Sequence, residues 1–581
     1  MNVPMQPTSF REPPEWLAPL GRNLAEALPR LHGVPPDPLV GELIAALTAA
    51  LERGELEVSL AGPAPEGVTA EGWPGLHRRA LERSPLSQDP DGPLDLEGDQ
   101  LRWRRWQRQR RAVLEALVDR AATPPTAVLS PNLPLRQDLE VLLDASQRRA
   151  VAAVLNHGLV LLEGGPGTGK TSTVAGMVRA MREQVPGARI HLAAPTGKAA
   201  ARLRSTTGPD TPCTTLHRLL ESRGNHFGRN RHHPLALDLL VVDEVSMVDM
   251  ALMSALLEAL PDRCRLVLVG DPAQLAPVGP GPVLLELQRP EWRQALGAAV
   301  ITLGTPYRND GAIATITAAL RQSGQQAPDP IAVIRPLLEN LPSTANLRWL
   351  EASPLTLPTE LLRRLDDHRL ELASLATTCS SAGTATKADT AAMLELLRLR
   401  DRLLVLSPLR KGRWGLEAIH GALLGDRIGG PLATWPAGLP VLCRRNLPEL
   451  GLANGDVGIL LGPQSAPDQR RVLFGDGGAR ERGEATGFTP QRLHPAQLAG
   501  AVEPALALTV HKAQGSEAEE VIVLLPARGH LDPGVPYTAL TRARRRALLI
   551  TPREDWSEAC VAAGSPLTNQ SEPSVSEQPK P

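Results

Sequence analysis

The sequence predicts an α/β protein with two parallel sheets, on the evidence of its length, its apolar runs and their spacing along the chain. A chain of 581 residues is too long for one hydrophobic core, because single cores stop growing at about 250 to 300 residues. Short, uniformly apolar runs such as GLVLLEG and RLVLVGD suit strands covered by helices on both faces. These runs fall into one group before about residue 300 and another after about residue 400. We therefore expect two sheets lying side by side.

The composition describes an ordinary globular protein. Hydrophobic residues make up 42% and charged residues 22% of the sequence, and the net charge is -1. A polyanion would have to be held in a local channel of Lys and Arg, because whole-molecule attraction is absent. The five cysteines form no C-x-x-C pair, which argues against a zinc module or an iron–sulfur cluster. With no signal peptide and no run of about 18 apolar residues, we expect a cytoplasmic protein without a membrane association.

The first 120 residues are predicted to form a small helical domain. Residues 39–51 and 102–118 carry apolar residues at helical spacing. The second segment includes RWRRWQRQRR, whose arginines could contact nucleic acid. Trp103 and Trp106 fit better as core residues of a helix whose basic face is solvated. Residues 121–137 are broken by prolines and lack periodicity, so they are predicted to be a linker.

The rest of the chain is predicted to divide into two α/β domains. Residues 138–300 hold the first group of apolar runs, and residues 301–560 hold the second. Within the second domain, about residues 429–499 are rich in Gly and Pro and contain short alternating strands such as DVGILL and RRVLF. This texture predicts an inserted small β-module. Residues 561–581 lack apolar content and are expected to be disordered.

The segment GLVLLEGGPGTGKTSTVAGMV places a G-x-x-x-x-G-K-T loop between a strand and a helix. Backbone N–H groups and the helix N-terminus hold phosphate in such a loop. Lys170 would neutralise the β- and γ-phosphates and Thr171 would ligate Mg²⁺, while the glycines let the backbone curl closely around the ligand. The predicted nucleotide-binding residues of this loop are Gly164, Gly165, Pro166, Gly167, Thr168, Gly169, Lys170, Thr171 and Ser172. The sequence therefore predicts binding of ATP with Mg²⁺.

Two later strand ends carry polar groups suited to hydrolysis. In LLVVDEVSM, Asp243 and Glu244 follow an apolar strand, where one carboxylate can position magnesium and the other can activate water. Such a pair is a weak signal alone, but its place after the phosphate loop favours ATP hydrolysis over mere nucleotide binding. In LVLVGDPAQLAPVG, Gln274 could sense the γ-phosphate or the attacking water. The alternative is an ordinary strand-to-turn sequence.

Two arginines are candidates for a transition-state charge supplied by the second domain. Arg308 lies in TPYRND and Arg542 in YTALTRARRR, both far along the chain from the phosphate loop. Each could be a simple surface charge. A motor, however, needs a second domain to supply positive charge, because that dependence couples hydrolysis to domain closure. Arg542 is the better candidate, since it lies within the second group of strands.

These segments belong to a longer series of landmarks that resembles a known family. The further landmarks are Gln147 in LDASQRRAV, PTGKAA at 195–200, TLHRLL at 215–220, SPLRKGRWG at 407–415, CRRNLPELGLANGDVGILL at 443–461 and TVHKAQGSE at 509–517. Over most of residues 138–552 the chain resembles the RecD-type superfamily 1B DNA helicases. The short helical N-terminus is most similar to the RecD-type chains that serve as the alpha subunit of exodeoxyribonuclease V.

The resemblance implies two RecA-like P-loop NTPase domains, an SH3-like β-barrel inserted in the second, and a partner-contacting N-terminal domain. It implies an ATP-driven motor that walks 5′ to 3′ on one DNA strand, beside RecB-like and RecC-like subunits, in double-strand break repair and recombination. We find no carboxylate-and-lysine nuclease constellation in the sequence. Any nuclease activity is therefore expected from a partner subunit.

The resemblance also implies roles for single residues. Gln147 would contact adenine and Asp243 would bind magnesium. Glu244 would contact the attacking water, and Gln274 would contact the γ-phosphate. Arg308 and Arg542 would stabilise the transition-state charge. DNA contacts are implied for Pro195, Thr196, Thr215, His217, Thr509, His511 and Lys512. The two histidines are equally well explained as hydrogen-bonded packing residues.

Three other interpretations compete with this one. A self-standing repair helicase of the same family is disfavoured by the short N-terminus. A structural subunit with a decayed motor is disfavoured because the phosphate loop, the carboxylate pair and both arginines are intact. A relaxase-linked helicase would need a nucleophilic tyrosine, and both tyrosines of the chain lie inside helicase motifs.

Residues 328–397 show no family landmark.

Overall fold

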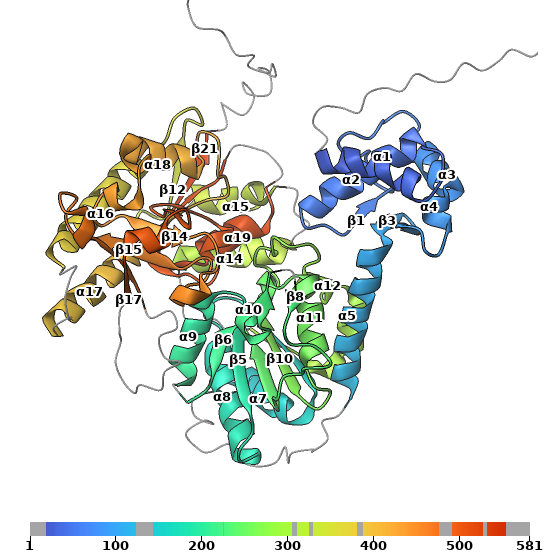
Figure 1. Cartoon of the computed structure of the whole chain (residues 1–581), viewed down its shortest axis with the longest axis horizontal. Helices are drawn as coiled ribbons and strands as arrows, with labels where there is room; N and C mark the ends of the chain where they lie inside the picture. The colour runs from blue at the N-terminus through green and yellow to red at the C-terminus, as the bar shows by residue number, and fades with distance from the viewer. Residues whose placement is uncertain are drawn as a thin grey trace, which may run out of the picture.

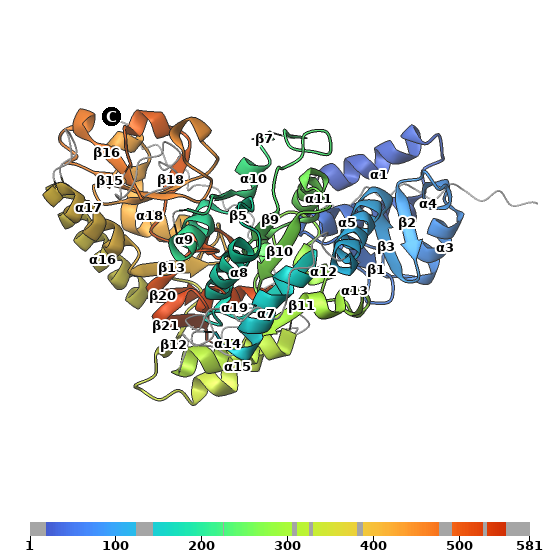
Figure 2. The same cartoon turned by 90° about the horizontal axis from the view of Figure 1, so that it is seen from below.

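The computed structural model describes residues 19–123, 143–208, 210–224, 226–304, 311–324, 329–379, 387–475, 491–526 and 531–553. Three parts follow one another in space as they do along the chain (Figure 1). An N-terminal unit leads through one long helix to a first parallel sheet, and a second parallel sheet with an antiparallel module lies beyond it (Figure 2). The predicted fold class, α/β with two parallel sheets and a helical N-terminus, is confirmed.

The N-terminal unit combines helices with a small sheet. Its elements are α1 (Pro19–Leu31), α2 (Pro38–Glu52), β1 (Glu57–Ser59), α3 (Gly75–Arg83), α4 (Pro85–Gln88), β2 (Leu94–Glu97) and β3 (Gln100–Trp103). Asp37 caps α2 by accepting from the Leu39 N–H at 2.9 Å, and Pro38 occupies the first helical position. The antiparallel sheet β1-β3-β2 was not predicted, because its strands have only three or four residues and show no clear alternation.

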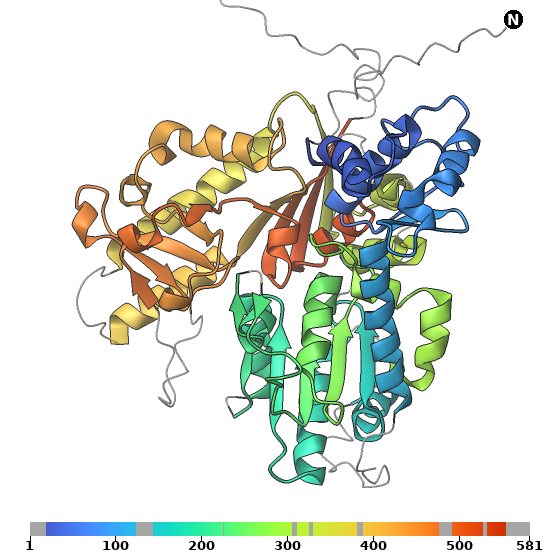
Figure 3. The same cartoon turned by 45° about the vertical axis from the view of Figure 1, so that its right-hand side comes forward.

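Helix α5 (Arg104–Ala122) leaves the N-terminal unit and runs along the first sheet (Figure 3). Its buried residues Val113, Leu114 and Leu117 join the same core cluster as Leu159 and Leu161 of the sheet. The helix ends inside the segment expected to be a linker, because its apolar stripe continues to the end of the helix. Residues 124–137 of the predicted linker lie outside the described residues.

The first sheet contains six parallel strands in the order β11-β4-β10-β9-β5-β6. They are β4 (Leu159–Gly164), β5 (Ile190–Ala194), β6 (Cys213–Thr215), β9 (Leu239–Val242), β10 (Arg265–Gly270) and β11 (Val300–Leu303). Its helices are α7 (Ala145–Asn156), α8 (Lys170–Gln184), α9 (Gly197–Thr207), α10 (Leu216–Leu219), α11 (Met250–Ala259), α12 (Val283–Glu286) and α13 (Pro290–Leu296), with a hairpin of β7 (Ser222–Arg223) and β8 (His226–Phe227). Every residue of β4, β9 and β10 is buried, which explains why these strands are apolar except for Glu163 in β4 and Arg265 in β10. Since β11 ends at Leu303, this sheet extends past the expected boundary at residue 300.

The second sheet has five parallel strands in the order β12-β21-β20-β13-β19. They are β12 (Leu347–Ala352), β13 (Leu403–Ser407), β19 (Leu508–Thr509), β20 (Ala518–Leu524) and β21 (Ala543–Pro552). The helices of this part are α14 (Gly311–Ser323), α15 (Pro330–Glu339), α16 (Thr359–Thr378), α17 (Lys387–Arg400), α18 (Leu416–Leu424) and α19 (Gly534–Leu540). The segment 328–397, which carried no landmark, thus supplies the edge strand β12 and helices α15 to α17.

The inserted module is a five-stranded antiparallel sheet in the order β17-β16-β15-β14-β18. Its strands are β14 (Pro440–Cys443), β15 (Val457–Leu461), β16 (Arg471–Phe474), β17 (Gln491–Leu493) and β18 (Val502–Pro504). Ile459 and Leu473 of the module pack against Leu372 of α16 and Met393 of α17. The expected small β-module is therefore present, and two helices of the unassigned segment support it.

Candidate nucleotide site and strand-binding face

The phosphate loop lies between the buried strand β4 and helix α8. Gly167 and Gly169 have φ angles of 73° and 81°, in the left-handed region that glycine adopts at little cost. The Thr168 hydroxyl donates to the Gly165 carbonyl at 2.9 Å and fixes the turn. This geometry leaves the loop amides and the N-terminus of a 15-residue helix free to face an anion.

Lys170 holds its ammonium group over the loop. Its Nζ donates to the carbonyl of Gly164 at 2.6 Å and to that of Gly165 at 3.0 Å. An ammonium has three donors, so one donor remains for a further acceptor. Thr171 is half-buried in the first turn of α8, and the neighbouring Ser172 is exposed. The ammonium group thus lies over the loop and Thr171 lies in the first helical turn, and their contacts with phosphate and magnesium stay predictions.

Gln147 lies beside this loop at the start of α7. It forms a capping box with Asp144: the Gln147 N–H donates to Asp144 Oδ1 at 2.8 Å, and the Asp144 N–H donates to Gln147 Oε1 at 3.0 Å. Its Nε2 donates to the Thr168 carbonyl at 3.2 Å. These bonds fix the buried amide against the phosphate loop. The predicted contact with adenine stays a prediction.

The carboxylate pair follows β9 at the same edge of the sheet. Glu244 has a φ of 54°, a strained conformation for a residue other than glycine, and its N–H donates to Asp243 Oδ1 at 2.9 Å. Burial, with a smaller contribution from Glu244, raises the pKa of Asp243 to about 6, while Lys170 acts in the opposite direction. A divalent cation would offset this cost of burying the carboxylate. The donor set therefore fits magnesium.

Gln274 belongs to the segment that follows β10. It is buried, and its Oε1 has no hydrogen-bond partner among the residues that the structure describes. A buried amide oxygen without a partner is costly, so it fits a site that receives a water or a ligand. The described residues contain no group of three or more His, Cys, Asp or Glu that could hold a metal. Magnesium bound here would rely on phosphate oxygens and water, as this ion commonly does.

The second sheet contacts the same segment after β10. The Tyr537 hydroxyl of α19 donates to Asp271 Oδ2 at 2.6 Å, and the Leu275 N–H donates to Thr538 Oγ1 at 2.7 Å. Gln514 Nε2 donates to the Leu275 carbonyl at 2.8 Å. All three hydrogen bonds are buried. The loop edge of the first sheet is therefore joined directly to the part of the chain that carries Arg542.

Of the two predicted arginines, the structure describes one. Arg542 is buried at the end of α19, where its Nε donates to the Thr538 carbonyl at 3.0 Å and its Nη2 to Thr541 Oγ1 at 3.2 Å. It lies close enough to Tyr537 to affect the pKa of that hydroxyl. Arg308 lies outside the described residues. Its proposed role is untested by this structure.

The predicted DNA-contacting residues gather at strand ends of both sheets. Pro195 and Thr196 follow β5, Thr215 ends β6, His217 lies in α10, Thr509 ends β19, and His511 and Lys512 begin a short 3₁₀ helix (His511–Ala513). Thr196 and Thr215 cap α9 and α10 through their hydroxyls. A Cβ built on Gly515 would lie 3.2 Å from Thr196 Oγ1, and Lys198 Nζ donates to Ser516 Oγ at 3.0 Å. The two sets of residues are thus adjacent across the two sheets.

The two histidines in this set lie among packed groups. Burial lowers the pKa of both His217 and His511. The His217 ring lies 6.3 Å from the Phe227 ring, centroid to centroid. Lys512 donates to Glu503 Oε1 at 2.6 Å, and Arg410 donates to Glu503 Oε2 at 2.9 Å. The packing role is favoured for His217, whereas Lys512 is held at the surface by a carboxylate.

Sequence reasoning missed two groups beside the phosphate loop. The Asp271–Tyr537 hydrogen bond joins residues that are 266 positions apart, so no local pattern could indicate it. Arg321, in the last turn of α14, reaches the loop: a Cβ built on Gly165 would lie 2.7 Å from Arg321 Nη1. A single arginine in an amphipathic helix carries no sequence signal, because basic residues near helix C-termini are common.

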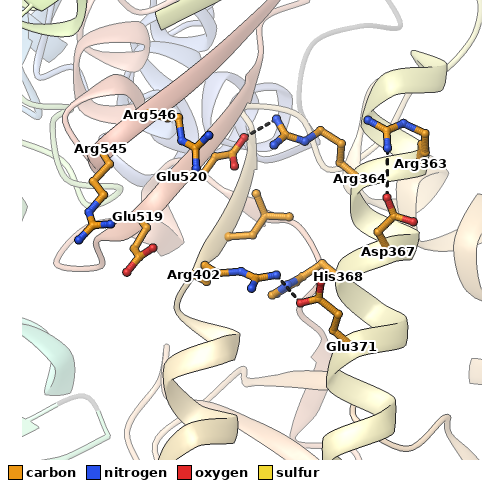
Figure 4. Close-up of a pocket in the computed structure, with 11 residues that line it drawn as sticks. Arg363, Arg364, Asp367, His368, Glu371, Arg402, Glu519, Glu520, Arg545 and Arg546 are labelled. Atoms are coloured by element: carbon orange, nitrogen blue, oxygen red, sulfur yellow. Dashed lines mark hydrogen bonds and ion pairs between the residues drawn. The ribbon is translucent and has the colours of Figure 1, made fainter. Parts of the chain in front are cut away.

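A cavity of about 380 Å³ lies where α16 faces the starts of β13, β20 and β21 (Figure 4). Its charges mostly pair within it. Arg363 donates to Asp367 at 3.2 Å, Arg364 pairs with Glu520, and Arg402 pairs with Glu371. A wall whose cations and carboxylates neutralise one another selects neither anions nor cations. We therefore assign no ligand to this cavity.

Comparisons with known proteins agree with this geometry. The AAA domain family matches residues 147–280, and the UvrD-like helicase C-terminal domain family matches residues 504–550. Two Pif1 helicase structures, one of two coordinating helicases at forked double-stranded DNA and one from Candida albicans, are 16% and 17% identical, each with a TM-score of 0.38. They cover 73% and 72% of this chain and 98% and 99% of their own chains. The two matched family models, together with the phosphate loop, define a P-loop helicase.

Curated relatives narrow this class to one family. The RecBCD enzyme subunit RecD of Mycolicibacterium smegmatis is 33% identical over 572 residues, which cover 92% of this chain and 93% of that protein. RecD of Mycobacterium tuberculosis is 34% identical, covering 83% of this chain and 81% of its own length. The ATP-dependent RecD2 DNA helicase of Deinococcus radiodurans is 33% identical, covering 72% of this chain and 50% of its own length. The chain belongs to the RecD family. In the part that the structure describes, no helix is long and apolar enough to span a membrane.

Proposed function

We propose that this helicase hydrolyses ATP with Mg²⁺ to move 5′ to 3′ along DNA in the cytoplasm, as one subunit of a RecBCD-type assembly with RecB-like and RecC-like partners. The observation that carries the proposal is the joining of the phosphate-loop edge of the first sheet to α19 of the second. A motor needs this arrangement, because hydrolysis at one sheet must change the position of the other.

The site residues have distinct roles in this proposal. Lys170 neutralises phosphate oxygens. Thr171 and Asp243 would hold magnesium, which when bound would supply charge stabilisation to the phosphate groups. Glu244 accepts the proton of the attacking water, and Gln274 offers its unpaired Oε1 to that water. Gln147 contacts the base. Arg542, with Arg308, supplies positive charge from the second domain.

Movement along DNA would depend on the contacts between the two sheets. The strand-binding residues of the first sheet, such as Thr196, lie next to Gly515 and Ser516 of the second. The nucleotide site lies at the other contact, through Asp271 and Leu275. A change in the angle between the sheets at the nucleotide site therefore also changes the spacing of groups that grip a strand. Grip on the phosphate backbone would come from amides, hydroxyls and Lys512.

Membership of a RecBCD-type assembly is supported by the extent of the match. The similarity spans 93% of the M. smegmatis RecD subunit, whereas it spans 50% of the RecD2 helicase. The self-standing repair helicase is the second candidate function. In the subunit, nuclease activity comes from a partner.

The test is ATP hydrolysis and unwinding by the full chain, alone and with RecB-like and RecC-like partners, on duplexes with 5′ or 3′ tails. Unwinding from 5′ tails supports the motor and its direction, and a requirement for both partners supports the subunit over the self-standing enzyme. Absence of DNA-stimulated hydrolysis by a folded protein in every mixture would contradict the proposal.

Lys170→Gln is the matched negative control. We expect it to abolish ATP turnover, because no other side chain of the loop Gly164–Ser172 carries a positive charge. The unfolding free energy should change little, since Lys170 is partly exposed and bonds only to two loop carbonyls. Urea unfolding monitored by circular dichroism checks the second point. Loss of the fold would show that Lys170 has a structural role as well.

A further inference from the structure

Arg321 brings a guanidinium group from the second domain to the phosphate loop. A Cβ built on Gly165 would lie 2.7 Å from Arg321 Nη1 and 3.5 Å from the Tyr537 hydroxyl oxygen. The end of the Arg321 side chain therefore lies directly beside the backbone of Gly165. A Cβ at position 165 would require this flexible end to shift.

The helix that carries Arg321 belongs to the second domain. Ile313, Ile316 and Leu320 of α14 are buried in one core cluster with Leu347 of β12 and Leu549 of β21. The Ile313 N–H also donates to Asn346 Oδ1 at 3.2 Å, immediately before β12. Arg321 is therefore positioned by the second sheet, while the loop it reaches belongs to the first. Its approach depends on how the two sheets face each other.

The surroundings of Arg321 leave its charge available. Among the described residues it has no ion-pair partner. The nearby carboxylate of Asp271 already accepts from the Tyr537 hydroxyl at 2.6 Å and from the Ala273 N–H at 3.2 Å. Burial and Asp271 raise the pKa of Tyr537, whereas Arg321 and Arg542 act in the opposite direction. Both guanidinium groups thus act on the same hydroxyl, and Arg321 is the one that reaches Gly165 of the loop.

We infer that Arg321 is a further catalytic residue, whose guanidinium contacts the terminal phosphate of the bound nucleotide. The inference rests on the proposed ATPase function. An unpaired guanidinium beside a phosphate loop is suited to this role, because its planar fork matches phosphate oxygens and it stays charged. Supplied by α14, it would stabilise charge that develops in the transition state only when the sheets are closed.

Arg321→Gln and Arg321→Lys test the inference in the full chain, with Gln322→Ala as control. Gln322 is exposed and adjacent on the same helix. The first readout is the affinity for AMP-PNP and for ADP, each with Mg²⁺, measured by titration calorimetry. Arg321→Gln should weaken AMP-PNP binding by about tenfold, since a charged hydrogen bond is lost. ADP binding should be unchanged, because ADP lacks the terminal phosphate.

The second readout is the rate of ATP hydrolysis. Arg321→Gln should lower kcat by about 10²-fold, the usual effect of removing one donor to a transition-state charge. Arg321→Lys should recover part of both effects, since lysine keeps the charge without the fork. Native affinity and native kcat in Arg321→Gln would overturn the inference. Equal losses for AMP-PNP and ADP would also overturn it, because they would indicate mere support of the loop. Native protein that binds no nucleotide would overturn the proposed function itself.

Discussion

Burial keeps several histidines neutral at physiological pH. His191, His368 and His420 each have a pKa lowered to about 4, with burial as the largest cause. His420 also uses its neutral form in a hydrogen bond: its Nε2 accepts from the Ala507 N–H at 3.3 Å. Protonation would replace this acceptor with a donor. Low pH therefore destabilises the folded state by protonating these buried histidine rings.

We expect the unfolding free energy to fall as the pH drops from 6.5 towards 4. In this window the unfolded chain binds protons that the folded chain excludes, so stability decreases as pH decreases. His420→Gln removes one titrating ring and keeps an acceptor. Its loss of stability between about pH 6.5 and pH 5 should be smaller than that of the native protein by roughly 1.5 kcal/mol. Urea unfolding at a series of pH values measures both slopes. Identical slopes would show that His420 does not contribute.

At the same scale, the sequence indicated the phosphate loop and the carboxylate pair because their chemistry is local. Lys170 and its glycines are neighbours in the chain, and Asp243 and Glu244 follow a strand whose burial is evident from its residues. Arg321 could not be predicted in this way. Its place beside Gly165 depends on the packing of α14, which a single arginine in a helix does not reveal.

Helix α5 joins the N-terminal unit to the first sheet. Its inner face contributes Leu114, which is fully buried in the core that contains Leu161 and Leu268. Arg110 of α5 pairs with Glu286 of α12 at 2.7 Å. The helix is therefore an integral layer of the first sheet and not only a connector.

Leu114→Ala tests this arrangement. We expect the unfolding free energy to fall by roughly 3 kcal/mol, because a buried leucine is replaced and a cavity is left in the core. Arg111→Ala on the outer face is the control. Arg111 is exposed and, among the described residues, forms an ion pair with Glu115 alone, so its replacement should change stability by less than about 0.5 kcal/mol. Denaturant unfolding measures both variants. Equal effects of the two changes would contradict the packing of α5 against the sheet.

Elements differ in how clearly their sequences indicate them. Strand β9 of the first parallel sheet is buried on both faces and uniformly apolar, so it was predictable. Strand β12 is half-buried over most of its length and contains Arg348 and Glu351, so nothing in its sequence distinguished it from a helix or a loop. The short strands β1 to β3 are specified by tertiary contacts with α2 rather than by their own pattern.

For the whole molecule, two sheets could be predicted but their mutual orientation could not. The groups that fix this orientation are far apart in the sequence. They form hydrogen bonds through backbone atoms or ordinary polar side chains. Gln514 reaches the Leu275 carbonyl, and the Leu275 N–H reaches Thr538. Leu275 is thus bonded on both sides by residues of the second domain. Leu275 therefore joins the segment that follows β10 to the second sheet through both of its backbone polar groups.

Thr538→Val removes one of these bonds with almost no change of shape. Thr538 is fully buried, and its hydroxyl accepts from the Leu275 N–H, which valine would leave without a partner. The unfolding free energy should fall by about 1 to 3 kcal/mol, the cost of a buried unsatisfied group. Stimulation of ATP hydrolysis by DNA should fall as well, because the sheets would be joined less firmly. Thr538→Ser keeps the hydroxyl and should retain the stimulation. If both variants retained native stimulation, the Leu275–Thr538 bond would have no part in coupling the sheets, and the Gln514–Leu275 and Tyr537–Asp271 hydrogen bonds would remain as the contacts that could transmit closure.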